Sequence, residues 1–204
     1  MHVAVIDIGS PKNLGWAIRG AKINGQGGGL DECIAALGLA LTQGQLALGF
    51  EAPLFVPLRD DPFSLTKARA GECAGGINRP FSAAAGASVL VTALTIVPHV
   101  LSRLRVLAPG VSATMDWRTP LASETRLLVF EAFVTNQGKS SDARHIEDAY
   151  AAIAAFQRGM EEPETFASAV TEDPCLSLIG AALLRTEWTT DLRALSRPCL
   201  VVRA

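Results

Sequence analysis

The chain has 204 residues, of which 49% are hydrophobic and 19% charged, and its formal net charge is −2 at pH 7. This composition excludes an intrinsically disordered chain and a disulfide-stabilised miniprotein. The small net charge excludes a global basic field that would draw the chain onto nucleic acid or an anionic membrane, so any nucleic-acid contact needs a local patch. We expect residues 1–204 to form a single domain with a sizeable core.

The predicted elements begin with the apolar run Val3–Ile8, which Asp7 alone interrupts and which indicates a central strand. A turn over residues 9–13 joins this strand to the next one in a hairpin. In chain order we expect strands over residues 3–8, 14–18 and 21–23, a helix over 30–42, a strand over 46–50, a helix over 82–107, a strand over 126–134, helices over 143–158, 163–170 and 176–188, and a strand over 198–203. This order predicts a mixed α/β sheet with helices on its faces.

Residues 80–102 carry no charge and are numerous enough to span a bilayer. The run is rich in Ala, Gly, Ser and Thr and contains Pro98 and His99, so we interpret it as a buried helix and expect no membrane contact.

The four cysteines are scattered, and none lies in a CxxC pair that would indicate a zinc site: Cys33, Cys73, Cys175 and Cys199. Unpaired cysteines suit a reducing compartment, and no basic segment precedes the first apolar run as in a signal peptide. We therefore expect a cytoplasmic protein.

Three acids stand where apolar residues would be expected. Asp7 shares a strand face with the two valines of its own strand. Glu51 stands at the end of the strand over 46–50, just before an Ala-Pro dipeptide. Asp148 lies on a helical stripe whose apolar members predict a buried face. The stripe consists of His145, Asp148, Ala149, Ala152 and Phe156.

Buried carboxylates that lie together repel one another and raise one another's pKa, and a divalent cation removes that cost. Carboxylate oxygens, with an imidazole beside them, suit Mg²⁺ or Mn²⁺. The sequence therefore predicts that Asp7, Glu51 and Asp148 bind such an ion. Two ions about 4 Å apart can activate water and stabilise the leaving oxygen of a phosphodiester.

The segments VIDIGSPKNLGWAI, LALGFEAP and ARHIEDAYAAIAA resemble the acidic sites of the RNase H-like superfamily. The chain looks most similar to the uncharacterised, predicted RNase H-like nucleases whose fourth strand ends in acid-Ala-Pro. It resembles more distantly the RuvC-type Holliday-junction resolvases, with their (Asp or His)-x-x-Asp pattern on the last core helix.

The resemblance covers residues 1–158 and implies a five-stranded mixed sheet, its first three strands antiparallel, with flanking helices. Residues 159–204 would add helices and a short strand. It also implies a nuclease that hydrolyses phosphodiester bonds by a two-metal mechanism, in which Asp7, Glu51, His145 and Asp148 are catalytic. Whether the substrate is RNA, DNA or a small nucleotide stays open.

Residues 59–81 form an irregular stretch that is long enough to be a functional loop. Basic residues in this loop and in the first hairpin turn are candidates for holding phosphate, and a serine after the loop is expected to cap the long helix. The candidate substrate-binding residues are Lys12, Asn13, Arg69, Arg79 and Ser82. Glu131, in the strand over 126–134, is either a further ligand or the partner of a neighbouring strand.

Two other functions stay open. The segment DIGSPKNLGWA also resembles the phosphate loop of actin-like kinases, although the chain is long enough for only one of the two lobes that those enzymes need. A non-catalytic binding or scaffold protein of RNase H-like fold is the other alternative, and a homodimer through the helix over 82–107 or over 176–188 fits either function.

Overall fold

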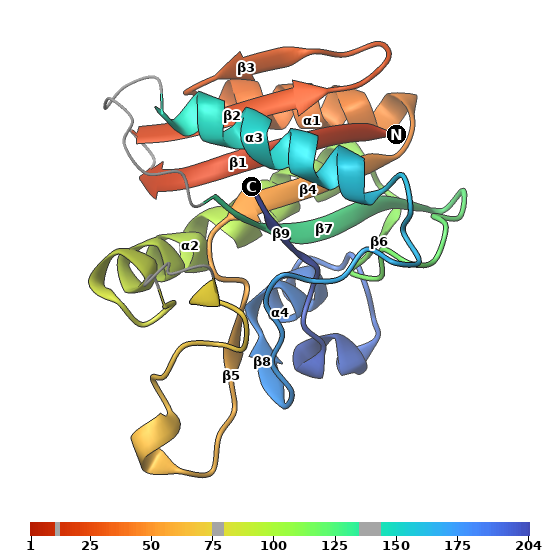
Figure 1. Cartoon of the computed structure of the whole chain (residues 1–204). Coiled ribbons are helices and arrows are strands. Elements are labelled where there is room, and N and C mark those ends of the chain that lie inside the picture. The colour runs from red at the N-terminus through yellow and green to blue at the C-terminus, as the bar shows by residue number, and fades with distance from the viewer. Residues whose placement is uncertain (11–12, 75–79, 135–143) are drawn as a thin grey trace.

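The computed structural model describes the chain except residues 11–12, 75–79 and 135–143. A central sheet orders its strands β3-β2-β1-β4-β7-β6, and β9 pairs with β7 off this path (Figure 1). The strands are β1 (His2–Ser10), β2 (Asn13–Arg19), β3 (Gly25–Gly27), β4 (Leu46–Glu51), β6 (Ser112–Thr114), β7 (Thr125–Phe133) and β9 (Val201–Arg203).

The sheet is mixed. Strand β2 is antiparallel to both β1 and β3, whereas β4, β7, β6 and β9 run parallel to their neighbours and to β1. The expected mixed α/β architecture is confirmed, but the described sheet has seven strands and not the five that the resemblance implied. The extra strands are β6, which extends the β7 edge, and β9, which comes from the C-terminal part of the chain.

The third strand was expected at residues 21–23 and lies instead at Gly25–Gly27. Its register places Gly27 opposite Trp16, and the indole lies against both glycines: a Cβ at Gly25 would be 3.4 Å from the ring and one at Gly27 would be 3.0 Å from it. The aromatic side chain on β2 therefore selects the glycine-bearing segment as its neighbour, a preference that strand propensity does not reveal.

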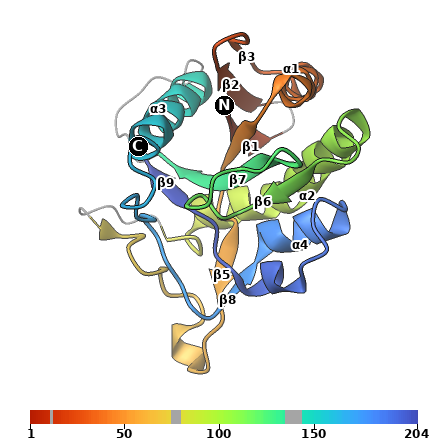
Figure 2. The same cartoon turned by 90° about the vertical axis from the view of Figure 1, so that its right-hand side faces the viewer.

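Helices cover both faces of the sheet. α3 (Arg144–Gly159) lies on one face, across β1 and β2, while α1 (Leu30–Gln43) and α2 (Ala84–Leu107) lie on the other (Figure 2). Strand alternation divides the core accordingly: Val3 and Val5 pack beneath α3, and Ile6 and Ile8 beneath α1 and α2. The sheet position of Asp7, on the face of the two valines, follows from this alternation as expected.

The expectation of a buried long helix holds for one face of α2 only. Its buried residues are Ala93, Ile96, Val97, Val100, Leu101 and Leu104. By length and composition alone α2 could cross a membrane, a test that core helices of soluble proteins also pass, and 28% of its most apolar window is buried. The other face exposes Val91, Leu94 and Val106. Absence of membrane contact and a cytoplasmic location stay predictions.

The C-terminal residues are built into the same fold. β8 (Cys175–Ser177) pairs with β5 (Phe55–Pro57) in a second, two-stranded sheet, and α4 (Leu178–Arg185) packs against α2. The helix expected over 176–188 is thus shorter, because its first residues are in β8. Two short 3₁₀ helices, η1 (Pro62–Ser64) and η3 (Leu192–Ser196), complete the described elements.

The helix expected over residues 163–170 is wrong. This segment consists of turns, bends and irregular chain. Phe166 packs edge-on against the Phe156 ring, and the Ala169 amide donates to the Val201 carbonyl. Tertiary contacts with α3 and β9 replace the local hydrogen bonds that a helix would have made.

Candidate metal centre

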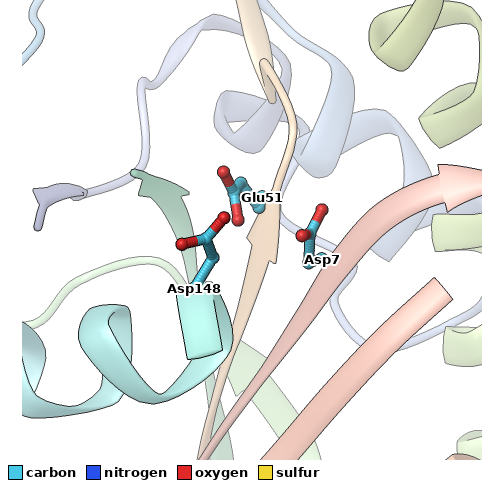
Figure 3. Close-up of side chains that lie close together, drawn as sticks. All are labelled: Asp7, Glu51 and Asp148. Carbon is cyan, nitrogen blue, oxygen red and sulfur yellow. The ribbon is translucent and has the colours of Figure 1, made fainter. Parts of the chain in front are cut away.

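Three carboxylates from three elements converge at one edge of the sheet (Figure 3). Asp7 belongs to β1, Glu51 is the last residue of β4, and Asp148 lies in the second turn of α3. One oxygen of each lies within 4.8 Å of the corresponding oxygens of the other two. The structure thus brings together the three residues that the sequence predicts as metal ligands.

Strand pairing accounts for two of these positions. β1 and β4 are parallel neighbours, and their register places Asp7 directly opposite Glu51. Parallel strands present their carboxyl ends at the same edge of a sheet, and residues in register point to the same face. Both carboxylates therefore reach the face that α3 covers.

Helix packing supplies the third carboxylate. Ala149 and Ala152 are fully buried against the sheet, and their small side chains let α3 lie close to β1 and β2. Farther along the helix, Phe156 stacks on Phe130 of β7 with ring centroids 4.5 Å apart. These contacts fix the rotation of α3, which directs Asp148 toward the strand ends.

His145, also predicted as a catalytic residue, contacts Asp7. Its Nδ1 lies 2.5 Å from Asp7 Oδ2. When Asp7 is ionised, as it must be to hold a cation, its carboxylate only accepts hydrogen bonds and Nδ1–H is the donor. This bond holds the Asp7 carboxylate in one orientation, as a group that supports a metal ligand does.

Gly15 makes this contact possible, and the sequence analysis missed it. It pairs with Asp7 across the β1–β2 hairpin, and a Cβ at Gly15 would lie 2.3 Å from the Cβ of His145. Only glycine lets the first turn of α3 approach β2 so closely. The Leu-Gly-Trp sequence inside an otherwise apolar strand was the available signal, since a glycine in a strand marks a close approach of other backbone.

The electrostatics of the site suit a cation. Burial raises the pKa of Asp7; the hydrogen bond and the charge of His145 lower it, and the neighbouring charge of Asp148 raises it again. The net direction is upward, so ionising Asp7 is costly without a nearby positive charge. A divalent cation between the carboxylates would remove this cost, and hard carboxylate oxygens are the donors that Mg²⁺ and Mn²⁺ prefer. The residues present therefore fit a metal ion.

The predicted substrate-binding residues are only partly described. Lys12 and Arg79 lie outside the described residues, and so does the side chain of Asn13. Ser82 does not cap α2: its hydroxyl donates to the Thr66 carbonyl, and Ala83 is the residue before the helix. This hydrogen bond instead connects the irregular stretch over residues 59–81 to the residues just before α2.

Arg69 is buried and does not face solvent. Its guanidinium bonds to both oxygens of Glu131, to Glu72 Oε1 and to the Phe55 carbonyl. All three charged side chains are about 1% exposed. This saturated cluster favours a structural role for Arg69 over direct contact with phosphate.

Glu131 lies on the opposite face of the sheet from the metal centre. It is in register with Phe50, one residue before Glu51, so alternation points it toward the α1 and α2 side. There it also accepts a hydrogen bond from the Leu54 amide. The structure therefore does not support Glu131 as a further metal ligand. Its partners are Arg69 and the Leu54 amide.

Comparisons with known proteins give no relative: no family model, no curated protein and no solved structure matches the chain. The function must therefore be inferred from the chemistry of the site itself.

Proposed function

We propose that the protein is a metal-dependent nuclease of RNase H-like fold. The observation that carries the proposal is the convergence of Asp7, Glu51 and Asp148 to within 4.8 Å at the carboxyl ends of two parallel strands. Clusters of this kind serve phosphoryl chemistry, because the ions they hold neutralise charge on the substrate.

The topology supports the RNase H-like assignment. A five-stranded path, β3-β2-β1-β4-β7, lies within the larger sheet, and its first three strands are antiparallel. The helix that carries His145 and Asp148 lies across β2 and β1, and β1 is the strand that carries Asp7. Strands β6 and β9 are additions to this path.

In the proposed reaction, Asp7, Glu51 and Asp148 hold Mg²⁺ or Mn²⁺. The ion, when bound, supplies Lewis acidity: it lowers the pKa of a water nucleophile and stabilises the charge on the leaving oxygen. Asp7 and Glu51, held by strand pairing, and Asp148, held by helix packing, keep the ligand oxygens together. With Asp7 ionised, Nδ1–H of His145 donates a hydrogen bond to its carboxylate and holds that group in one orientation.

The test is calorimetric titration of Mn²⁺ into the wild type and into Asp7→Asn, followed by incubation of both with labelled single-stranded, duplex and branched DNA and RNA. We expect binding and cleavage in the wild type and neither in the variant. Asn keeps the hydrogen-bond acceptor for His145 but removes the charge, so a folded, inactive variant isolates the charge of Asp7. A wild type that binds no Mn²⁺ and cuts no substrate would leave the non-catalytic scaffold as the better alternative.

A further inference from the structure

A cavity of about 420 Å³ opens at the carboxyl ends of β4 and β7. Glu51 is common to both, because it is one of the residues that line the cavity and its carboxylate belongs to the carboxylate cluster. A group bound in the cavity would therefore lie next to whatever the metal centre holds.

The accessible part of this lining is apolar. Phe81, Val89 and Phe133 are half-buried and line the cavity together with alanines at the start of α2. The charged side chains at the base belong to the Arg69 cluster, whose members are about 1% exposed and are bonded to one another. The cavity thus offers apolar and aromatic surface, and Glu51 is the lining residue that it shares with the carboxylate cluster.

The walls of the cavity are held in place by specific contacts. Gly86 allows the turn before α2 to lie against the helix, since a Cβ there would be 2.7 Å from the Pro80 carbonyl oxygen and 2.8 Å from that of Phe81. On the other wall, the Arg203 guanidinium covers Phe133 at 5.2 Å from the ring centroid and donates to the Gly71 carbonyl. These contacts position the backbone of Phe81 and the ring of Phe133 in the protein without a ligand.

We propose that this cavity binds the base of the nucleotide next to the scissile phosphate. The proposal rests on the proposed nuclease function and adds the part of the substrate that the enzyme recognises. The volume lies in the range of about 300–1,000 Å³ typical of small-ligand sites. Aromatic side chains stack with any nucleobase, whether it comes from DNA or RNA, without requiring one sequence.

The first test compares oligonucleotides that carry a single abasic residue at successive positions with the intact strand, in a DNA series and an RNA series. We expect kcat/KM of the wild type to fall about ten- to a hundredfold when the missing base is the one beside the cleaved bond. Removal of bases elsewhere should have a smaller effect. Equal cleavage of every abasic strand would overturn the proposal, and the series that shows the effect identifies the source of the base.

The second test fills the cavity. Ala85 lines it and is exposed, so Ala85→Trp places an indole in the base site without disturbing the core. The matched control is Ala84→Trp, the neighbouring exposed alanine of the same helical turn, which does not line the cavity. We expect Ala85→Trp alone to lower kcat/KM on the intact strand to the level of the abasic strand. Identical kinetics for the two variants would contradict the proposal.

A third measurement separates the cavity from the nuclease function. Adenosine 5′-monophosphate is titrated with EDTA present into the wild type, Ala85→Trp and Ala84→Trp. Binding that only Ala85→Trp abolishes supports the base site even if no strand is ever cleaved. No binding, or equal binding by all three proteins, overturns the base site and leaves the Asp7→Asn comparison to decide the nuclease function alone.

Discussion

The two faces of the central sheet hold buried carboxylates in opposite arrangements. On the α3 face, Asp7, Glu51 and Asp148 point their oxygens at one another. On the other face, Glu72 and Glu131 both point at the guanidinium of Arg69. The second arrangement is complete within the chain and stabilises the fold, whereas the first is suited to an ion that is acquired from solution.

The two arrangements differ because Glu51 and Glu131 are offset by one residue in the register of β4 and β7. Glu131 lies opposite Phe50, and the next residue, Glu51, points to the other face. Side chains alternate along a strand, so a shift of one position moves a carboxylate from one face to the other. Two acids near the same strand ends thus lie in separate surroundings, although they are close together in the sheet.

The sharpest way to break this comparison is to neutralise one acid on each face. Asp7→Asn should lower metal-dependent cleavage about a thousandfold or more, because it removes several kcal/mol of charge stabilisation and each 1.36 kcal/mol corresponds to tenfold in rate. Glu131→Gln should leave Mn²⁺ affinity within a few-fold of the wild type. The same loss of Mn²⁺ binding in both variants would show that the two faces are not distinct.

The second prediction concerns stability. Arg69→Met should lower the free energy of unfolding by about 3–5 kcal/mol, because it leaves two buried carboxylates without their common cation. Arg193→Met is the control, since Arg193 pairs with Asp191 at the surface and is 73% exposed; it should cause no measurable change. Denaturant unfolding measures both, and a stable Arg69→Met protein would argue that the cluster does not support the fold.

The third prediction sharpens the role of the hairpin in the metal centre. Gly15→Ala would push the first turn of α3 away from β2 and weaken the contact of His145 with Asp7. We expect Mn²⁺ affinity to fall about 10–100-fold, as for the loss of other groups that orient a ligand. Gly44→Ala serves as control because nothing lies within 4 Å of its Cβ position. Unchanged affinity in Gly15→Ala would exclude His145 as a positioning group.

The smallest expected effect is on the pH dependence of the metal-free protein. Folding raises the pKa of Asp7, so its contribution to stability is present below the ordinary aspartate pKa and is lost as the pH rises through the raised, folded value. Asp7→Asn should remove this loss, and thermal unfolding between acidic and neutral pH measures it. Without metal, the Tm of the wild type at neutral pH should lie below that of Asp7→Asn. Added Mn²⁺ should raise the Tm of the wild type and leave that of the variant unchanged.

Local patterns were sufficient to predict most of the first 158 residues. The apolar strands follow from continuous apolar runs, and the helices over 30–42 and 143–158 follow from helical spacing of apolar residues. Both patterns are local and do not depend on which element packs against them. The acidic positions were recognisable for the same reason: Asp7 interrupts an apolar strand, and Asp148 lies on a stripe with buried apolar residues.

The sequence by itself determined which acids are unusual, because a charge among apolar residues is visible without coordinates. Only the tertiary structure decided which of them meet. Strand register places Asp7 and Glu51 together and directs Glu131 to the other face, and a long-range hydrogen bond from Ala169 to Val201 holds the irregular segment 163–170 beside β9. Register and close approach depend on contacts between residues far apart in the chain, as Gly15 and His145 illustrate, and a local pattern contains no record of them.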